Sequence, residues 1–206
     1  MTTVYLVRHS IPFKVHRGIE EIDESLLFSN MKTPLSVEGE ELSRKVSFND
    51  EFFNIDEVWS SDYVRTMSTA KYFAYNNNLK VNVSNRLGER KHGVKSWNEL
   101  PSNFEIKQFE DENYKVGNGE SRKEVSERII KKLYEIIDNN KNKRILIVGH
   151  STAFAYLLSN WCEVKYDGPY TFGNKDFFDG KWDYCESFKL VFDDNNKLVS
   201  IENLCL

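Results

Sequence analysis

Two histidines follow apolar, strand-like runs, where polar side chains are unfavourable unless they find partners. The segment "TVYLVRHS", residues 3–10, puts Arg8 and His9 directly after sheet-forming residues. The segment "RILIVGHS", residues 144–151, puts His150 in the same place. Either histidine alone is more often a capped strand end than a catalyst. The repeated placement, together with the arginine, favours a binding or catalytic site that contains Arg8, His9 and His150.

Two more polar residues follow strand-like runs and could complete this site. "EVWSSDYVRTMSTA" passes from strand into helix and places Arg65 near the helix N-terminus, where free N–H groups and the helix dipole attract anions. "RLGERKHG" follows the run Leu79–Val83 and contains Glu89. A lone arginine in a helix or a lone glutamate in a loop is usually solvated. Ligands of open α/β sheets bind outside the carboxyl ends of the strands, so neighbouring strands would bring these residues together.

Strand-like and helical patterns alternate along most of the chain. The strand-like runs are Val4–Val7, Ile55–Trp59, Leu79–Val83 and Ile145–Val148. Helical patterns cover residues 36–47, 62–76, 121–137 and 152–161, and the expected N-caps are Ser36, Ser121 and either Ser61 or Asp62. The segments "ESFKLVF", "DDNNK" and "LVSIEN" predict a C-terminal hairpin. The alternation predicts an α/β fold with a mostly parallel central sheet flanked by helices.

Two stretches, residues 94–118 and 163–183, do not fit the alternation. Both are rich in aromatic residues, Asn, Asp and Gly, and neither has a clear period. Long connections of this kind are often functional lids. We expect residues 94–118 to form a lid, whereas a lid and an ordinary irregular surface fit residues 163–183 equally well. The chain is otherwise expected to form one domain, residues 1–206, without a linker or an internal repeat.

Size and charge exclude several classes of function. A chain of 206 residues is long enough for one substantial core. The formal net charge of -4 argues against binding to nucleic acid or to an anionic membrane. The three cysteines, Cys162, Cys185 and Cys205, have no zinc-type spacing and cannot all pair within one chain, which favours reduced thiols in a cytoplasmic protein. The short apolar start is expected to be neither a signal peptide nor a membrane span.

Six short segments occur in order along the chain: "LVRHS", "TPLSVEGEEL", "SSDYVRTMSTA", "LGERKHG", "NGESRKEVSERI" and "IVGHS". Together with the terminal hairpin they resemble the histidine phosphatase superfamily, also called the phosphoglycerate mutase-like superfamily. The pair Arg-His alone would mean little, but the ordered set is specific. The resemblance implies a three-layer α/β sandwich of the phosphoglycerate mutase-like type.

The resemblance also implies phosphoryl transfer through a phosphohistidine at His9. A phosphomonoester dianion does not repel a neutral imidazole as it would repel a carboxylate or a thiolate. Arg8 and Arg65 would hold the phosphoryl oxygens with forked donors, and His150 would add a donor on the remaining side. Ser10 stands where the family usually has glycine, and its hydroxyl could donate to phosphate or only tighten the turn.

One carboxyl group can protonate the leaving oxygen and then activate water. Glu89 is the candidate for this role, and Glu20, Glu21 and Glu120 compete with it. The guanidinium groups can stabilise the charge that a metal stabilises elsewhere, so we expect neither a metal nor another cofactor. The four histidines show no zinc-ligand spacing, which agrees with this expectation.

The expected substrate is a small phosphorylated metabolite. His16 and Arg90 could extend the basic pocket beyond the phosphate. Lys14 and Arg17 could do the same, although exposure at the surface is the simpler interpretation for these two. The residues do not identify the alcohol that carries the phosphate.

Three functions remain open at this point, and they differ in the fate of the phosphate. The segment "IPFKVHRGIEEIDESLLFSN" replaces the Glu-Ser…Trp-Asn segment usual in mutases, so a metal-independent phosphatase is preferred to a cofactor-dependent phosphoglycerate mutase. A non-catalytic phospho-ligand or protein-binding module is the third hypothesis. It is disfavoured because His9, Glu89 and His150 are all present.

Overall fold

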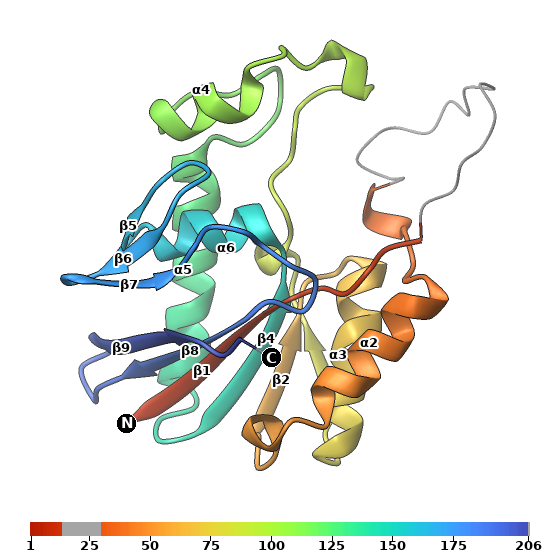
Figure 1. Ribbon diagram of the computed structural model, residues 1–206, viewed down its shortest axis with the longest axis vertical. Helices are drawn as coiled ribbons and strands as arrows, with labels where there is room; N and C mark the ends of the chain where they lie inside the picture. The colour runs from red at the N-terminus through yellow and green to blue at the C-terminus, as the bar shows by residue number, and fades with distance from the viewer. Residues whose placement is uncertain (14–29, 206) are drawn as a thin grey trace.

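A six-stranded sheet forms the centre of the molecule (Figure 1). The computed structural model describes residues 1–13 and 30–205. The strand order is β3-β2-β4-β1-β8-β9. The strands are β1 (Thr2–Arg8), β2 (Glu57–Ser60), β3 (Val81–Val83), β4 (Arg144–Gly149), β8 (Ser187–Phe192) and β9 (Leu198–Asn203). Strands β1 to β4 run parallel, whereas β8 pairs antiparallel with β1 and with β9. The predicted mostly parallel sheet with a C-terminal hairpin is confirmed.

Helices cover both faces of this sheet. They are α2 (Val37–Ser47), α3 (Val64–Asn76), α5 (Arg122–Asp138) and α6 (Ser151–Leu158). Side chains along a strand point alternately to opposite faces. Val4 and Leu6 of β1 therefore pack in one core with residues of α5 and α6, whereas Tyr5 and Val7 pack in another core with residues of α2 and α3. The result is the expected three-layer α/β sandwich.

Two helices begin at the caps that the sequence predicts. The Ser36 side chain accepts a hydrogen bond from the N–H of Gly39 at 3.1 Å and caps α2. Ser121 and Glu124 form a capping box at the start of α5, in which each side chain accepts a hydrogen bond from the backbone N–H of the other. These caps therefore set the residues at which α2 and α5 begin.

The expected cap of α3 is wrong. The N-cap of this helix is Tyr63, without a side-chain cap hydrogen bond, rather than Ser61 or Asp62. The Ser61 hydroxyl is instead hydrogen-bonded to the His150 ring at 2.9 Å and to the Thr66 hydroxyl at 2.7 Å. Ser61 thus joins the start of α3 to a distant strand end, and its hydroxyl also accepts from the N–H of Tyr63 at 3.3 Å.

The two stretches outside the alternation contain short elements that periodicity did not predict. Residues 94–118 hold η3 (Trp97–Glu99) and α4 (Phe104–Glu110), and residues 163–183 hold a separate sheet of β5 (Glu163–Val164), β6 (Tyr170–Phe172) and β7 (Lys175–Phe178). Two further 3₁₀ turns are η1 (Asp50–Phe52) and η2 (Asn85–Leu87). Figure 1 shows α4 on the side of the sheet toward which β1, β2 and β4 run. Within the described ranges, no helix is long and apolar enough to cross a membrane.

Candidate active site

The register between β1 and β4 brings two histidines together. Arg8, the last residue of β1, lies opposite Gly149, the last residue of β4. His9 and His150 come next, and the N–H of His9 donates to the carbonyl of Gly149 at 2.9 Å. The two ring centroids are 5.4 Å apart, with an interplanar angle of 66°. The expectation that neighbouring strands would bring the imidazoles together is confirmed.

His9 has the properties of a neutral nucleophile. Its Nδ1 lies 2.7 Å from the carbonyl oxygen of Ser10, and because a carbonyl only accepts, Nδ1 carries the hydrogen. The lone pair of the neutral ring is then on Nε2. Burial lowers the pKa of His9 to about 3; Arg65 and Arg8 lower it too, and the hydrogen bond to Ser10 opposes them. At neutral pH the ring is therefore uncharged.

His150 orients one of the arginines. Its ring is fully buried, with 0% exposed. A guanidinium only donates, so His150 Nδ1 accepts from Arg65 Nη2 at 3.2 Å, and His150 Nε2 donates to Ser61 Oγ at 2.9 Å. Burial, followed by Arg65 and His9, holds the pKa of His150 well below its ordinary value. Neutral His150 thus links α3 to the end of β4, and its role as a donor to phosphate stays a prediction.

Arg65 comes from the first turn of α3 and is 6% exposed. Its Nη1 donates to the carbonyl of Asn30 at 2.6 Å, and its guanidinium carbon lies 4.8 Å from the centroid of the Tyr63 ring. With the contact to His150, the guanidinium is held on three sides. A side chain fixed in this way can offer a forked donor to an anion at little entropic cost.

Arg8 is held by residues at the end of the 163–183 stretch and just beyond it. Its Nη1 donates to the carbonyl of Trp182, and its guanidinium carbon lies 4.5 Å from the centroid of the Tyr184 ring. Its Nε is buried and has no hydrogen-bond partner in the part of the chain that the structure describes. A buried donor without a partner is unfavourable. Arg8 therefore has donor capacity that an anion beside His9 would satisfy.

Glu89 lies within electrostatic reach of both arginines. Burial lowers the pKa of Arg65, and Glu89 is the foremost group that opposes this shift. At Arg8, burial again lowers the pKa, and Tyr184 and then Glu89 oppose it. Glu89 is partly exposed and lines a cavity of about 350 Å³. Glu89 thus combines two properties that an acid and base of this site needs: it is close enough to influence both arginines, and it has access to solvent.

The competing carboxylates are in different situations. Both oxygens of Glu120 are occupied by Arg128, from Nε to Oε1 at 2.8 Å and from Nη2 to Oε2 at 2.9 Å. Glu20 and Glu21 lie outside the described residues. Among the carboxylates the structure describes, Glu89 is therefore the better candidate than Glu120.

Ser10 is fully buried at the turn that follows His9. Its N–H donates to Thr69 Oγ1 at 3.0 Å, which ties the turn to α3. Its buried hydroxyl makes no hydrogen bond to a nitrogen or oxygen atom among the described residues, but it faces the Cys185 thiol, where it opposes the rise in pKa that burial causes. The backbone contact fits the turn-tightening interpretation, and a contact between the hydroxyl and phosphate stays a prediction.

Arg90 has a place in the interior that the sequence did not predict. It is 4% exposed, donates to Gln108 Oε1 at 2.7 Å and to the Tyr156 hydroxyl at 3.1 Å, and forms an ion pair with Glu105. Gln108 and Glu105 belong to α4 and Tyr156 belongs to α6, so Arg90 anchors one helix to the other. Its contact with substrate stays a prediction. Outside the described residues lie His16, Lys14 and Arg17.

Sequence reasoning missed the residues that hold His150 and Arg8 in place. Ser61 and Trp182 act through contacts across 89 and 174 residues of sequence, to His150 and to Arg8 respectively. Position alone offered a weak signal for Ser61, because it directly follows a strand. For Trp182 the signal was the aromatic composition of residues 163–183, and Tyr184 lies just beyond this stretch.

The fold and this geometry define an α/β protein in which two histidines and two arginines meet at the carboxyl edge of the sheet. The model of the histidine phosphatase superfamily (branch 1) matches residues 4–197, and the chain belongs to this family. A relative from Escherichia coli O1:K1, named "Probable phosphoglycerate mutase GpmB", is 29% identical over 171 residues, which cover 77% of this chain and 74% of that protein.

Solved structures with the same fold include two phosphatases. A phosphoserine phosphatase mutant from Entamoeba histolytica, in complex with phosphoserine, superposes with a TM-score of 0.67 at 18% identity and covers 98% of this chain and 97% of that one. A mycobacterial glucosyl-3-phosphoglycerate phosphatase, in complex with inorganic phosphate, gives 0.69 at 16% identity, with 98% and 94% covered. At these identities the likeness concerns the fold.

Proposed function

We propose that the protein is a metal-independent phosphomonoester hydrolase that works through a phosphohistidine at His9. The observation that carries the proposal is the neutral His9 ring, with its lone pair on Nε2, beside two guanidinium groups and the second histidine. Arg8 and Arg65 attract a phosphomonoester dianion, and the neutral ring does not repel it. The substrate is a small phosphorylated metabolite.

In the first half-reaction, His9 Nε2 forms a bond to phosphorus while the bond from phosphorus to the leaving oxygen breaks. Charge spreads over the three equatorial oxygens, and Arg8 and Arg65 stabilise it with fixed, forked donors. The leaving alkoxide takes the proton of the Glu89 carboxyl group. The products of this step are the free alcohol, the phosphohistidine and the Glu89 carboxylate.

In the second half-reaction, water attacks phosphorus and the Glu89 carboxylate takes one of its protons. The bond from phosphorus to Nε2 breaks, which returns the lone pair to His9 and releases inorganic phosphate. Glu89 ends protonated and ready for the next turnover, so one carboxyl group serves as acid and then as base.

This scheme predicts a difference between leaving groups. An alkoxide cannot leave without a proton, whereas p-nitrophenolate is stable and leaves almost unaided. Alkyl phosphates therefore depend on Glu89 in both half-reactions, and p-nitrophenyl phosphate depends on it mainly in the second.

A cofactor-dependent phosphoglycerate mutase is the second candidate, because the relative described above carries that name. A mutase would keep the phosphohistidine from water and pass the phosphoryl group to a second hydroxyl. A non-catalytic binding module is disfavoured, because a binding module has no need of a neutral nucleophile beside an acid and base.

A panel of phosphomonoesters, assayed with a metal chelator present, tests the proposal. We expect free phosphate to appear at an undiminished rate in the chelator. Incubation with 3-phosphoglycerate separates the two candidates: a phosphatase releases phosphate, whereas a mutase yields 2-phosphoglycerate. Loss of activity in the chelator, or 2-phosphoglycerate as the main product, would contradict the proposal.

A further inference from the structure

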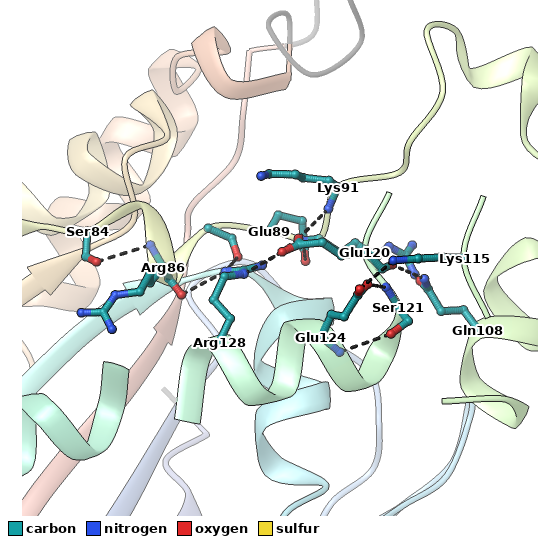
Figure 2. Close-up of polar contacts among 12 residues, drawn as sticks. Ser84, Arg86, Glu89, Lys91, Gln108, Lys115, Glu120, Ser121, Glu124 and Arg128 are labelled. Atoms are coloured by element: carbon teal, nitrogen blue, oxygen red, sulfur yellow. Dashed lines mark hydrogen bonds and ion pairs between the residues drawn. The ribbon is translucent and has the colours of Figure 1, made fainter. Parts of the chain in front are cut away.

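The segment that carries Glu89 is held on both sides by one ion pair, between Glu120 and Arg128. Figure 2 shows Arg128 reaching from α5 toward the Arg86 segment and toward Glu120, with Glu89 and Lys91 on the adjoining chain. The catalytic scheme does not use either member of this pair. Most of its contacts nevertheless fall on the segment from Arg86 to Lys91, on either side of Glu89. The carbonyl of Glu120 also accepts from Gln108 Nε2 of α4 at 2.7 Å.

Arg128 fixes the chain before Glu89. Its Nη1 donates to the carbonyl of Arg86 at 2.9 Å and to the carbonyl of Gly88 at 3.1 Å. Two acceptors on one donor group fix both the position and the direction of this short segment. The carbonyl of Gly88 belongs to the peptide bond that enters Glu89, so the backbone of Glu89 is constrained directly.

Glu120 fixes the chain after Glu89. Its Oε2 accepts from the N–H of Lys91 at 3.0 Å, and its own N–H donates to the carbonyl of Lys91 at 2.8 Å. The same carboxylate takes the forked contact from Arg128 described above. Glu89 therefore lies between two backbone anchors that are joined through a single pair of side chains.

The stretch 94–118, called the insertion from here on, begins and ends beside Glu120. The point where its two ends meet is called its neck. Gly93 has a φ of +79°, and a Cβ atom there would lie 2.2 Å from the backbone nitrogen of Gly119. A Cβ atom on Gly119 would lie 2.7 Å from the carbonyl oxygen of Lys91. The chain entering the insertion and the chain leaving it are thus in backbone contact, directly beside Glu120.

The pair is sheltered enough to act as a fixed element. The side chains of Arg128 and Glu120 are 19% and 15% exposed. Salt screens such a pair less than it screens exposed charges. The forked geometry adds directional specificity that a single contact lacks.

We infer that the Glu120–Arg128 pair is a positioning device that holds Glu89 at the reacting oxygen and separates it from the insertion. The inference rests on the proposed function, because it assigns the pair a purpose only if Glu89 is the acid and base. Neither Glu120 nor Arg128 touches the substrate in this account. Their effect passes through the backbone on either side of Glu89.

The test compares Glu120→Gln and Arg128→Gln on an alkyl phosphate and on p-nitrophenyl phosphate. A misplacement of about 1 Å can reduce a rate about 10²-fold. We expect kcat on the alkyl substrate to fall by about ten-fold or more beyond any fall in the burst rate constant of the aryl substrate, which reports its first turnover. We also expect Arg128→Gln to add little to Glu89→Gln in the double variant, because a carboxylate that is absent cannot be misplaced.

Glu135→Gln is the matched control. Glu135 lies on the same helix and forms a forked ion pair with the side chain of Arg86, but it makes no contact with the backbone beside Glu89 that the structure records. Its side chain is 40% exposed. The ratio between alkyl and aryl substrates should stay unchanged in this variant.

Equal losses on both substrates, or effects that add fully in the double variant, would overturn the inference and leave the pair with a structural role alone. Thermal unfolding of each variant shows whether it folds. If Arg128→Gln does not fold, Glu120→Gln and Arg128→Lys give the same comparison. A wild-type protein that hydrolyses neither substrate would instead contradict the proposed function itself, and the inference with it.

Discussion

At the scale of single residues, the site depends on side chains that the surrounding protein keeps uncharged or fixed. His9 is neutral because burial and two nearby cations disfavour its protonated form. The same two cations, Arg8 and Arg65, favour the anionic substrate. In the proposed mechanism one arrangement thus prepares the nucleophile and binds its target, because a neutral ring adds no charge that would repel the substrate dianion.

Arg65→Lys should not behave as a conservative substitution. An ammonium group cannot reproduce the forked contact of a guanidinium that His150 and Asn30 hold in place. We predict a loss of roughly ten-fold or more in kcat/KM, measured by steady-state kinetics. Arg44→Lys, at an exposed position of α2, is the control and should change nothing. Wild-type kinetics in Arg65→Lys would show that Arg65 only has a packing role.

Glu89→Gln should separate the two half-reactions. Alkyl phosphates should slow by about 10²–10⁴-fold, the usual contribution of general acid–base catalysis. With p-nitrophenyl phosphate, stopped-flow measurements should show a burst of nitrophenol followed by slow turnover, because phosphohistidine accumulates when water lacks its base. If both substrates lose activity equally and no phosphoenzyme accumulates, another group supplies the proton.

The sequence was sufficient for the residues at strand ends and insufficient for the residues that hold them. His9 and His150 could be predicted because each follows an apolar run, and parallel strands end at the same edge. Arg90 shows the limit of this reasoning. It follows Glu89 directly, yet it turns into the interior to meet α4 and α6, and no local pattern distinguishes that direction from the opposite one.

At the scale of elements, the strands and helices of the alternating pattern were predictable, and the short elements within residues 94–118 and 163–183 were not. The apolar residues of α5 recur at helical spacing and its capping box is local, so both its start and its buried face could be predicted. The sheet of β5, β6 and β7 is held by aromatic packing between distant residues, such as Tyr170 with Trp182, whose ring centroids are 6.3 Å apart. Period 2 cannot be recognised in strands of two to four residues.

Gly93→Ala tests the neck of the insertion. The residue has a φ of +79°, and a Cβ atom would lie 2.0 Å from the carbonyl oxygen of Val116. We predict a loss of about 2 kcal/mol or more in the free energy of unfolding, measured with urea. Gly173→Ala is the matched control, because Gly173 also has a positive φ, +62°, but nothing lies within 4 Å of its Cβ position. Equal losses in both variants would mean that the backbone contact at the neck contributes nothing.

At the scale of the whole molecule, attraction for an anion is local rather than global. The formal net charge is -4. Long-range steering of a phosphomonoester toward the protein is therefore weak, and in the proposed function binding depends on the arginines at the sheet edge. The site also makes the stability of the fold sensitive to acid. The neutral histidines at this edge take up protons only when the protein unfolds.

Acid should destabilise the protein through His9. Its pKa is about 3 in the folded protein and about 6.5 in the unfolded chain, so the unfolded state binds more protons below pH 6.5. Stability is full above that pH and falls as the pH drops toward 3. Between pH 6.5 and pH 5, His9 should contribute a loss of about 2 kcal/mol in the free energy of unfolding. Urea titrations of His9→Gln should show a correspondingly smaller loss, and an identical loss would contradict the assigned pKa.

The central claim is that His9 carries the phosphoryl group between the two half-reactions. Rapid quenching of the protein with phosphate-labelled substrate, in the presence of a chelator, tests it most directly. We predict an acid-labile, base-stable adduct that peptide mapping places on His9 and that is absent from His9→Ala, together with loss of turnover in that variant. Unimpaired turnover in His9→Ala, or label on any residue other than His9, would contradict the account.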